Sequence, residues 1–419
     1  MSVAVLGGGL QGCCLAMALA DRGVDVVLID RNDRLMTQAA VANEGKIHLG
    51  YMYAADLSLR TARKMMEGAL SFAPFFSRYL GTPRETLPTS NPAVYLAHRD
   101  SQRDVDEIAA YLKSVHQIIN DQPASVRDGY FGRDLLSPPE RWTQAALERE
   151  FDPELVMGAF SSPEVAIDPV ALTGMIRERI AQTPNIDIWL NTEVLCVDGE
   201  APLVVVTARD GQTSRTSFDH VANALWDGRL SIDERRGLRP QRPWIYRLKY
   251  GVAFRPAQET PVHRAITVIS GPFGEVVPYA DGTIYLTWYP ACVRALDQGL
   301  VPPDWPMYPD EPVRSEILQG TFDGLAELMP ELARCDLSKS TNIAVRGGKI
   351  VAWGNSDIYD PDSELHQRFE IGVSSVGHYH TVDPGKLTLA PLFATECADR
   401  IAPDPALVGT QGGLNVVTG

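Results

Sequence analysis

The stretch VAVLGGGLQGCCLAMALADRGVDVVLID, residues 3–30, decides the fold that this sequence predicts. It begins with an apolar run of the kind found in a fully buried parallel strand. A glycine cluster follows, and an apolar helix is expected over residues 10–22, with Gly23 suited to end it. A second apolar strand over residues 24–29 ends at Asp30. This order predicts the first unit of a dinucleotide-binding fold.

The glycine cluster has the spacing G-x-G-x-x-G, and each glycine has a physical role. Gly7 permits a tight turn, Gly9 lets the backbone approach a pyrophosphate, and Gly12 lets the helix lie close to the strand. Leu10 and Gln11 begin the helix, where unpaired N–H groups and the positive end of the helix dipole favour an anion. We therefore expect all of these residues to contact the cofactor.

The acid at the end of the second strand narrows the choice of dinucleotide. Asp30 can accept hydrogen bonds from a ribose hydroxyl pair, and it would repel the extra phosphate of NADP. Arg31 follows it and is a further candidate contact. The motif alone does not separate FAD from NAD. A tight turn that binds nothing is disfavoured, because the strand, turn, helix, second strand and acid all occur in order.

The bulk composition excludes several classes of partner. The chain has 419 residues, 45% hydrophobic and 22% charged, as in a globular protein large enough for two packed domains. Its net charge of −15 argues against nucleic acid or an anionic membrane surface as the main partner. The cysteines are scattered without a C-x-x-C pair, so no metal site is expected. No signal peptide or membrane span is recognised, which predicts a cytoplasmic location, and nothing indicates the oligomeric state.

Beyond residue 30 the pattern does not continue as simple alternating strands and helices. An amphipathic helix is expected over residues 60–80, and Asp168-Pro169 is a good start for another. Residues 242–289 are rich in strand signals, including a hairpin with Asp281-Gly282 at its turn. The end of the chain predicts a strand, a glycine-bearing loop and a helix from about Lys386. The nucleotide-binding pieces are therefore expected to be split along the chain.

At this point the sequence resembles the D-amino acid oxidase-like (DAO) superfamily of FAD-dependent oxidoreductases. Residues 3–30 match the family's FAD-binding start, although most members have glutamate where Asp30 stands. The stretches VAIDPVALTGMI and NTEVLCV, residues 165–176 and 191–197, are similar to a second family passage. There the resemblance places Val194 beside the adenine.

Two further stretches carry the resemblance. DHVANALWDGR, residues 219–229, stands where members have a strand ending in Asn-Ala-Ala-Gly under the cofactor, and here Leu225 and Trp226 replace the last Ala-Gly. GHYHTVDPGKLTLAP, residues 377–391, is similar to the C-terminal loop and helix that close over the flavin. Its GKLT segment looks like that of glycerol-3-phosphate dehydrogenases. The resemblance implies cofactor contacts from Gly377, Gly385, Lys386, Leu387 and Thr388.

A histidine stands in NEGKIHLGYMY, residues 43–53, a stretch that resembles one in L-2-hydroxyglutarate oxidases. A lone histidine in apolar company is more often a hydrogen-bonded core residue. The resemblance instead implies that His48 lies near the flavin, as a base, a substrate contact or a covalent tether. We expect FAD to be bound without a covalent link. Weaker candidates for the same pocket are Tyr51, Tyr53, Tyr246, His378 and His380, of which the two histidines alternate if extended.

Arg346, in NIAVRGG, falls where many amine-oxidising relatives have Leu-Arg-Pro. The arginine of those relatives binds the substrate carboxylate, a task that suits a planar bidentate donor. Gly347 replaces the proline, and an arginine in a surface ion pair is the competing interpretation. The resemblance thus implies Arg346 and His48 as the catalytic candidates.

The sequence predicts an α/β fold in which a β-rich substrate domain is inserted into a discontinuous, Rossmann-type FAD-binding domain. The expected FAD-binding pieces are residues 1–84, 151–238 and 340–419, and the expected substrate-binding pieces are residues 85–150 and 239–339. The predicted activity is removal of a hydride from a small amine or amino-acid-like substrate, expected to bear a carboxylate, to give an imine that hydrolyses. Oxidation of a 2-hydroxy acid or other alcohol is the alternative. An NAD-dependent dehydrogenase and a non-catalytic flavoprotein are the other classes left open.

Overall fold

The computed structural model describes residues 1–257 and 262–404, which form three sheets and the helices around them. The six-stranded sheet has the order β17-β18-β10-β1-β2-β6. All neighbouring pairs in it are parallel except β17 and β18. Its strands are β1 (Ser2–Leu6), β2 (Asp25–Ile29), β6 (Ile186–Trp189), β10 (His220–Asn223), β17 (Val373–Val376) and β18 (Tyr379–Val382).

The nine-stranded sheet has the order β15-β11-β14-β13-β12-β3-β5-β4, with β16 also paired to β11. Its pairs are antiparallel except β12 with β3. Its strands are β3 (Ala93–His98), β4 (Glu140–Arg141), β5 (Val156–Ser161), β11 (Trp244–Arg255), β12 (Ala265–Ile269), β13 (Gly274–Pro278), β14 (Ile284–Trp288), β15 (Val293–Asp297) and β16 (Thr341–Trp353). The three-stranded antiparallel sheet contains β7 (Glu193–Asp198), β8 (Leu203–Arg209) and β9 (Gln212–Phe218).

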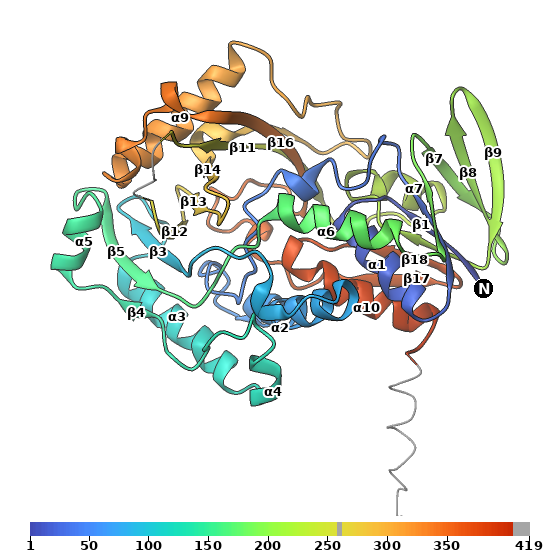
Figure 1. Cartoon of the computed structure of the whole chain (residues 1–419), viewed down its shortest axis with the longest axis horizontal. Helices are drawn as coiled ribbons and strands as arrows, with labels where there is room; N and C mark the ends of the chain where they lie inside the picture. Colours follow the sequence, from blue (N-terminus) through green and yellow to red (C-terminus); the bar gives the residue numbers. More distant parts are fainter. Residues whose placement is uncertain (258–261, 405–419) are drawn as a thin grey trace, which may run out of the picture.

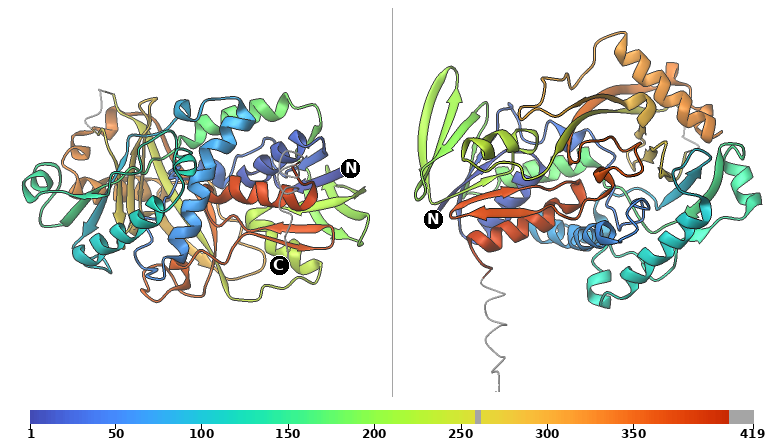
Figure 2. Two further views of the ribbon diagram at one scale, coloured as in Figure 1. Left: turned by 90° about the horizontal axis from the view of Figure 1, so that it is seen from below. Right: turned by 180° about the vertical axis from the view of Figure 1, so that it is seen from behind.

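The helices cover these sheets, as Figures 1 and 2 show. The six- and three-stranded sheets lie toward one end of the molecule, and most of the nine-stranded sheet lies toward the other with α3, α5 and α9. The α-helices are α1 (Leu10–Asp21), α2 (Arg60–Leu80), α3 (Val105–Asn120), α4 (Ala124–Arg127), α5 (Gln144–Glu150), α6 (Pro169–Ala181), α7 (Arg229–Arg235), α8 (Tyr289–Cys292), α9 (Val313–Leu328) and α10 (Ala390–Ile401). The 3-10 helices are η1 (Ala39–Val41), η2 (Arg84–Thr86), η3 (Trp226–Gly228), η4 (Leu332–Arg334), η5 (Leu337–Lys339), η6 (Glu364–His366) and η7 (Leu387–Leu389).

The glycine turn joins β1 to α1 as predicted. Gly7 has a φ of +99°, which glycine adopts without strain, and its N–H donates to the carbonyl of Ile29 at 2.8 Å. A Cβ on Gly12 would lie 1.8 Å from the carbonyl oxygen of Gly7. Helix α1 is buried from Leu10 to Ala20, because small and apolar side chains let it pack against the sheet on one side and α10 on the other.

Three other local predictions can be compared with the structure. Helix α6 begins where expected, since the Asp168 side chain accepts hydrogen bonds from the N–H groups of Val170 and Ala171. The hairpin at Asp281-Gly282 is confirmed, because β13 and β14 pair around it. The helix start at Lys386 is wrong: Lys386 is extended, η7 follows, and α10 begins only at Ala390. Pro391, which lacks an N–H group, stands in the first turn of that helix.

The division into two domains remains a prediction. Strand β5 pairs with β3 and β4, and β16 pairs with β11, so both strands belong to the nine-stranded sheet. Both strands fall in ranges, 151–238 and 340–419, that the expected division assigns to the FAD-binding domain. Placing the domain boundaries after β5 and after β16 would keep all strands of the nine-stranded sheet in one domain.

The close approach of α1 and β1 predicts the effect of a small substitution. Gly12→Ala should lower the free energy of unfolding by about 2–3 kcal/mol, because the helix must move away from the Gly7 carbonyl. Gly174→Ala is the matched control: it lies within α6, where a Cβ would meet nothing within 4 Å. The control should raise the same free energy by about 0.5–1 kcal/mol. Denaturant unfolding followed by circular dichroism measures both, and equal effects would contradict the packing argument.

Candidate active site

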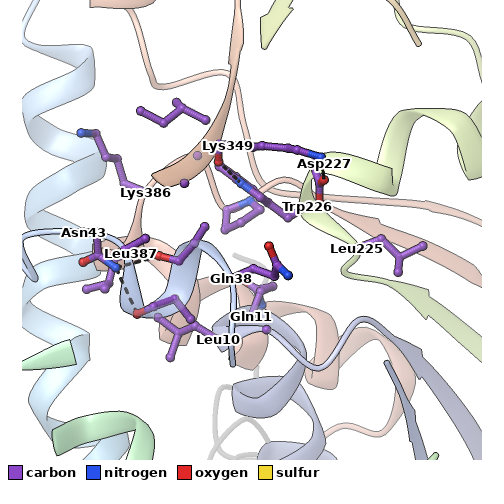
Figure 3. Close-up of a pocket in the computed structure, with 18 of the residues that line it drawn as sticks. Leu10, Gln11, Gln38, Asn43, Leu225, Trp226, Asp227, Lys349, Lys386 and Leu387 are labelled. Atoms are coloured by element: carbon purple, nitrogen blue, oxygen red, sulfur yellow. Dashed lines mark hydrogen bonds and ion pairs between the residues drawn. The ribbon is translucent and has the colours of Figure 1, made fainter. Parts of the chain in front are cut away.

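A cavity of about 570 Å³ lies where the six-stranded and nine-stranded sheets meet. The glycine turn and the segments after β2 and β10 form one side of it, and residues of β11 and β16 form another. The C-terminal loop before η7 completes the wall. Figure 3 shows part of this wall, with residues from the N-terminal, central and C-terminal parts of the chain. The volume is in the range of small-molecule and cofactor sites.

The glycine turn presents an unpaired polar group to the cavity. Gly7, Gly9, Leu10 and Gln11 all line it. The buried Gln11 side chain has no hydrogen-bond partner for Nε2 or Oε1 in the part of the chain that the structure describes. A buried amide without partners is unfavourable, so a polar ligand at this helix N-terminus fits the site. Gly12 lies outside the cavity wall and instead allows the close packing of α1.

Asp30 lines the cavity and also fixes the glycine turn. Its carboxylate accepts hydrogen bonds from the N–H of Gly8 at 2.6 Å, the N–H of Asn32 at 2.8 Å and the side-chain amide of Asn32 at 2.7 Å. Arg31 lines the cavity beside it, and so do Val194 at the start of β7 and the Leu225-Trp226 pair after β10. The two residues that replace Ala-Gly therefore do lie at the site.

The C-terminal loop contributes to the site in two ways. Gly385, Lys386 and Leu387 line the cavity. Thr388 is completely buried behind the wall, where its hydroxyl donates to the carbonyl of Lys46 and accepts from the N–H of His48, both at 3.1 Å. Thr388 thus holds the histidine segment in place. The predicted contact from Gly377 is not supported, because Gly377 lies in the turn between β17 and β18, outside the cavity wall.

His48 lines the cavity and is paired with a buried carboxylate. Its Nδ1 lies 3.0 Å from Oε1 of Glu164, and its side chain is 2% exposed. Glu164 is fully buried and also accepts hydrogen bonds from the N–H of Leu49 at 2.8 Å and from the hydroxyl of Tyr95 at 2.5 Å. Because Glu164 accepts at Nδ1, the Nε2 atom of a neutral His48 carries the lone pair.

Burial and the carboxylate have opposite effects on the histidine. Burial lowers the pKa of His48, and the hydrogen bond and charge of Glu164 only partly offset this. Burial alone would raise the pKa of Glu164, but its hydrogen bond to His48 and the other favourable contacts outweigh that effect and lower it. At neutral pH the pair is therefore a neutral imidazole beside an ionised carboxylate. Within the described residues, Nε2 of His48 makes no hydrogen bond, so it is free to accept a proton from a ligand.

The same cavity is rich in positive charge. Eight cationic side chains line it, against five acidic ones. The cations are Arg31, Lys46, Arg235, Arg247, Lys249, Lys349, Arg368 and Lys386.

Two of these cations lack hydrogen-bond partners. Arg247 is 1% exposed and lies 2.9 Å from Asp357, but its Nε and Nη2 make no hydrogen bond to any described residue. Lys46 is 2% exposed, and its Nζ is likewise without a partner among the residues placed by the structure. Lys249, in contrast, lies 3.0 Å from Glu44. Buried cations without partners are costly, so an anionic ligand would stabilise them.

Lys386 and Arg368 add to this positive field. Burial, beside the charge of Arg368, lowers the pKa of Lys386. Arg368 is buried and donates to the carbonyl oxygens of Leu365 at 3.2 Å and Gly385 at 3.5 Å. Lys386 is part of the C-terminal loop, and Arg368 is hydrogen-bonded to that loop at Gly385. Both positive charges therefore lie where the loop meets the cavity.

The predicted substrate ligand Arg346 is not in the cavity wall. Its Nη1 donates to the carbonyl of Val41 at 3.2 Å, and its guanidinium lies over the ring of Tyr308 at 5.8 Å. The structure therefore gives no support to the prediction that Arg346 binds the substrate. Arg247 in the adjacent strand β11 lines the cavity instead.

Of the other residues predicted for the pocket, one lines the cavity and four lie outside its wall. Tyr53 lines the cavity, whereas Tyr51 is buried outside its wall and the hydroxyl of Tyr246 donates to the carbonyl of Asp227 at 3.1 Å. The two remaining histidines, His378 and His380, lie outside the wall and both stack on His220, with ring centroids 4.3 and 5.4 Å away. They share one side, as residues two positions apart do in an extended chain, so the expectation that at most one of them would face a given site was wrong.

Sequence patterns had not revealed Glu164 or most of the cations. Arg247 and Lys249 alternate in YRLKY, residues 246–250, so both face one side of β11. Two charges at that spacing in an apolar strand were a signal for a charged inner face. Glu164 gave no such signal, because only the folded chain brings it to His48.

The described residues contain no group of three or more histidine, cysteine or acidic side chains that could hold a metal ion. Among the same residues, no helix has the length and apolar character needed to cross a membrane. Cys13 and Cys14 are free and buried.

Comparisons with known proteins agree with this site. The family model described as "DAO: FAD dependent oxidoreductase" matches residues 2–399. The glycerol 3-phosphate oxidase of Mycoplasma pneumoniae is 28% identical over 192 residues, which cover 46% of this chain and 45% of that protein. The matched regions span less than half the length of the curated relatives.

Two solved structures share the fold over nearly their whole length. Glycine oxidase from Geobacillus kaustophilus has a TM-score of 0.67 and 17% identity, covering 100% of this chain and 99% of that one. L-α-glycerophosphate oxidase from Mycoplasma pneumoniae with FAD bound has a TM-score of 0.63 and 16% identity, covering 96% and 95%. The choice between FAD and NAD is thereby answered in favour of FAD, which suits the glycine turn, Asp30 and the unpaired Gln11. The chain is an enzyme of the DAO family of FAD-dependent oxidoreductases.

Proposed function

We propose that the enzyme oxidises a small 2-hydroxy acid at the carbon that bears the hydroxyl group. The observation that carries this proposal is the buried His48–Glu164 pair in a cavity lined by positive charge. When bound, FAD supplies the hydride acceptor. The side chains of the protein must then bind the acid, orient its carbon and remove the hydroxyl proton.

His48 is the proposed base. Its neutral Nε2 accepts the hydroxyl proton of the substrate, while Nδ1–H continues to donate to Glu164. The imidazole becomes positively charged in this step, and the fixed carboxylate 3.0 Å away stabilises that charge. The hydrogen bonds from Tyr95 and Leu49 keep Glu164 ionised and in place.

The cations are the proposed binding groups for the substrate carboxylate. Arg247 and Lys46 have unused donors in the cavity, and Arg368 adds a further charge. A protonated amine would be repelled by the same groups, which disfavours an ammonium substrate.

Oxidation of an amine or amino acid, the activity favoured by the sequence, becomes the second candidate. It relied on Arg346, which lies outside the cavity wall. Its remaining support is Glu44, a carboxylate in the wall that could attract an amine, although Lys249 already pairs with it. The fold is also similar to that of glycine oxidase.

Anaerobic reduction of the bound flavin, followed by its absorbance, tests the two candidates. We would compare acids with the same carbon skeleton: glycolate with glycine, lactate with alanine, and malate with aspartate, with glycerol 3-phosphate as a further alcohol. At least one hydroxy acid should reduce the flavin about 100-fold faster than its amino counterpart. The reverse preference would establish the amine candidate, and no reduction by any compound would contradict both.

Removal of the base should slow flavin reduction. His48→Asn should lower the rate of anaerobic reduction by about 10²–10⁴-fold, the usual contribution of a positioned base. His380→Asn is the matched control, since His380 is also buried but lies outside the cavity wall. A control variant that slows reduction as much as His48→Asn would rule out a specific role for His48.

The pH dependence should identify the same residue. The base must be unprotonated, so the rate should fall as the pH drops through the pKa of His48, which lies below the ordinary histidine value of about 6.5. Glu164→Gln removes the charge and weakens the hydrogen bond that contribute most to raising this pKa, so the acid limb should move to lower pH while the maximal rate decreases. An acid limb that stays unchanged in the variant would show that another group titrates.

Loss of a binding cation should affect KM more than kcat. Arg247→Met should raise KM for the hydroxy acid by about 30- to 1,000-fold, because a buried charge partner of the carboxylate is lost. Arg346→Met, in the neighbouring strand but outside the cavity wall, should leave KM within about twofold. Equal effects of the two variants in steady-state kinetics would remove Arg247 from the substrate site.

The flavin is proposed to be bound without a covalent bond. The candidate tether His48 already uses Nδ1 for Glu164 and, as the proposed base, needs Nε2 for the substrate. Acid precipitation of the holoenzyme should therefore release all flavin into the supernatant as intact FAD. Yellow colour that remains with the pellet would show a covalent link.

A further inference from the structure

The cavity wall contains a link between the two large sheets that involves neither the glycine turn nor the substrate cations. Trp226 and Asp227 lie in η3, directly after β10, and Lys349 lies in β16. The indole Nε1 of Trp226 donates to the carbonyl of Lys349 at 2.7 Å, and Nζ of Lys349 lies 3.2 Å from Oδ2 of Asp227. Figure 3 shows both contacts across the same part of the cavity. We call Trp226, Asp227 and Lys349 the clasp.

The clasp is extended by a third charge. Oδ2 of Asp227 also lies 3.4 Å from Nη2 of Arg31, the residue after Asp30. The side chains of Asp227 and Lys349 are only 15% and 16% exposed, so salt screens this pair less than a surface pair. The ion chain therefore runs from the nucleotide end of β2 through η3 to β16 of the other sheet.

The backbone of the clasp is strained. Trp226 has a φ of +55°, which is unfavourable for a bulky residue, whereas the glycine expected here by resemblance would adopt it freely. The surroundings hold this conformation, because the Tyr246 hydroxyl donates to the carbonyl of Asp227 at 3.1 Å and the indole packs against an apolar cluster that includes Leu230 and Val351. Strain that the surroundings maintain in a cavity wall indicates a function for the residue.

We propose that the clasp is part of the FAD-binding site and retains the cofactor. Trp226, Asp227, Lys349 and Arg31 line the same cavity as the glycine turn. Their links join opposite walls, one from the six-stranded sheet and one from β16, so the walls cannot separate while the links are formed. A dinucleotide on the glycine turn is released when the hydrogen bond and the ion pair open together. The clasp thus sets the rate of FAD release, independently of which substrate is oxidised.

Release of FAD from the holoenzyme tests this proposal without any substrate. Dissociation is followed by the rise in flavin fluorescence after dilution. Trp226→Phe keeps an aromatic ring but removes the N–H donor, and Asp227→Asn removes the charge that Lys349 and Arg31 share. Each variant should release FAD at least about tenfold faster than the wild type. Release from the wild type should accelerate between about 0.05 M and 0.5 M NaCl, and Asp227→Asn should reduce this salt dependence.

Two controls separate retention from general stability. Trp142→Phe removes an indole hydrogen bond of 2.8 Å to Ser161, and Asp106→Asn removes an exposed ion pair of 2.7 Å to Arg141, both outside the cavity wall. Neither control should change FAD release by more than about twofold. The proposal is overturned if the clasp variants release FAD at the wild-type rate, or if the controls accelerate release equally. The salt dependence of the wild type needs no variant, and its absence would also count against the clasp.

Discussion

The site depends on one buried negative charge. Glu164 is fully buried, and three donors from two parts of the chain satisfy it: the His48 ring and the Leu49 N–H of one segment, and the hydroxyl of Tyr95 in β3. A carboxylate in this position is stable only while those donors remain, because loss of one partner of a buried pair costs about 3–5 kcal/mol. The position of His48 and the tautomer of its ring both follow from this requirement. The same contacts hold the centre of the fold together and orient the imidazole, while burial lowers its pKa and keeps it neutral inside the cavity.

The electrostatics of the cavity are opposite to those of the whole chain. The net charge is −15, yet eight cations and only five acids line the cavity. The acidic exterior disfavours nucleic acid and anionic surfaces, while the local cations suit the small anionic substrate that we propose. Lys46 and Arg247 are central to that proposal, because both are buried and have N–H donors without hydrogen-bond partners among the described residues, although Arg247 also forms an ion pair with Asp357.

The sequence predicted well the parts that depend on local geometry. The turn around Gly7 and Gly12, the acid at Asp30 and the start of α6 at Asp168 follow from backbone rules within a few residues. The resemblance placed His48 and the C-terminal loop near the flavin but could not supply their partners. Glu164 lies 116 positions from His48, and no local pattern encodes that pairing. Arg346 lies outside the cavity wall whereas Arg247 lines it, and a motif match cannot say which of two adjacent strands presents its side chain to the cavity.

The hydrogen bond between the His48 segment and Thr388 has a consequence for when the site forms during synthesis. The hydroxyl of Thr388 accepts the hydrogen bond of His48 across 340 positions of sequence, and it lies near the end of the described chain. During synthesis, the glycine turn and the histidine loop leave the ribosome long before the residue that fixes them. The reactive centre is therefore completed only after Thr388 has been translated, and a nascent chain that stops before this residue lacks the hydrogen bond from the His48 backbone to Thr388.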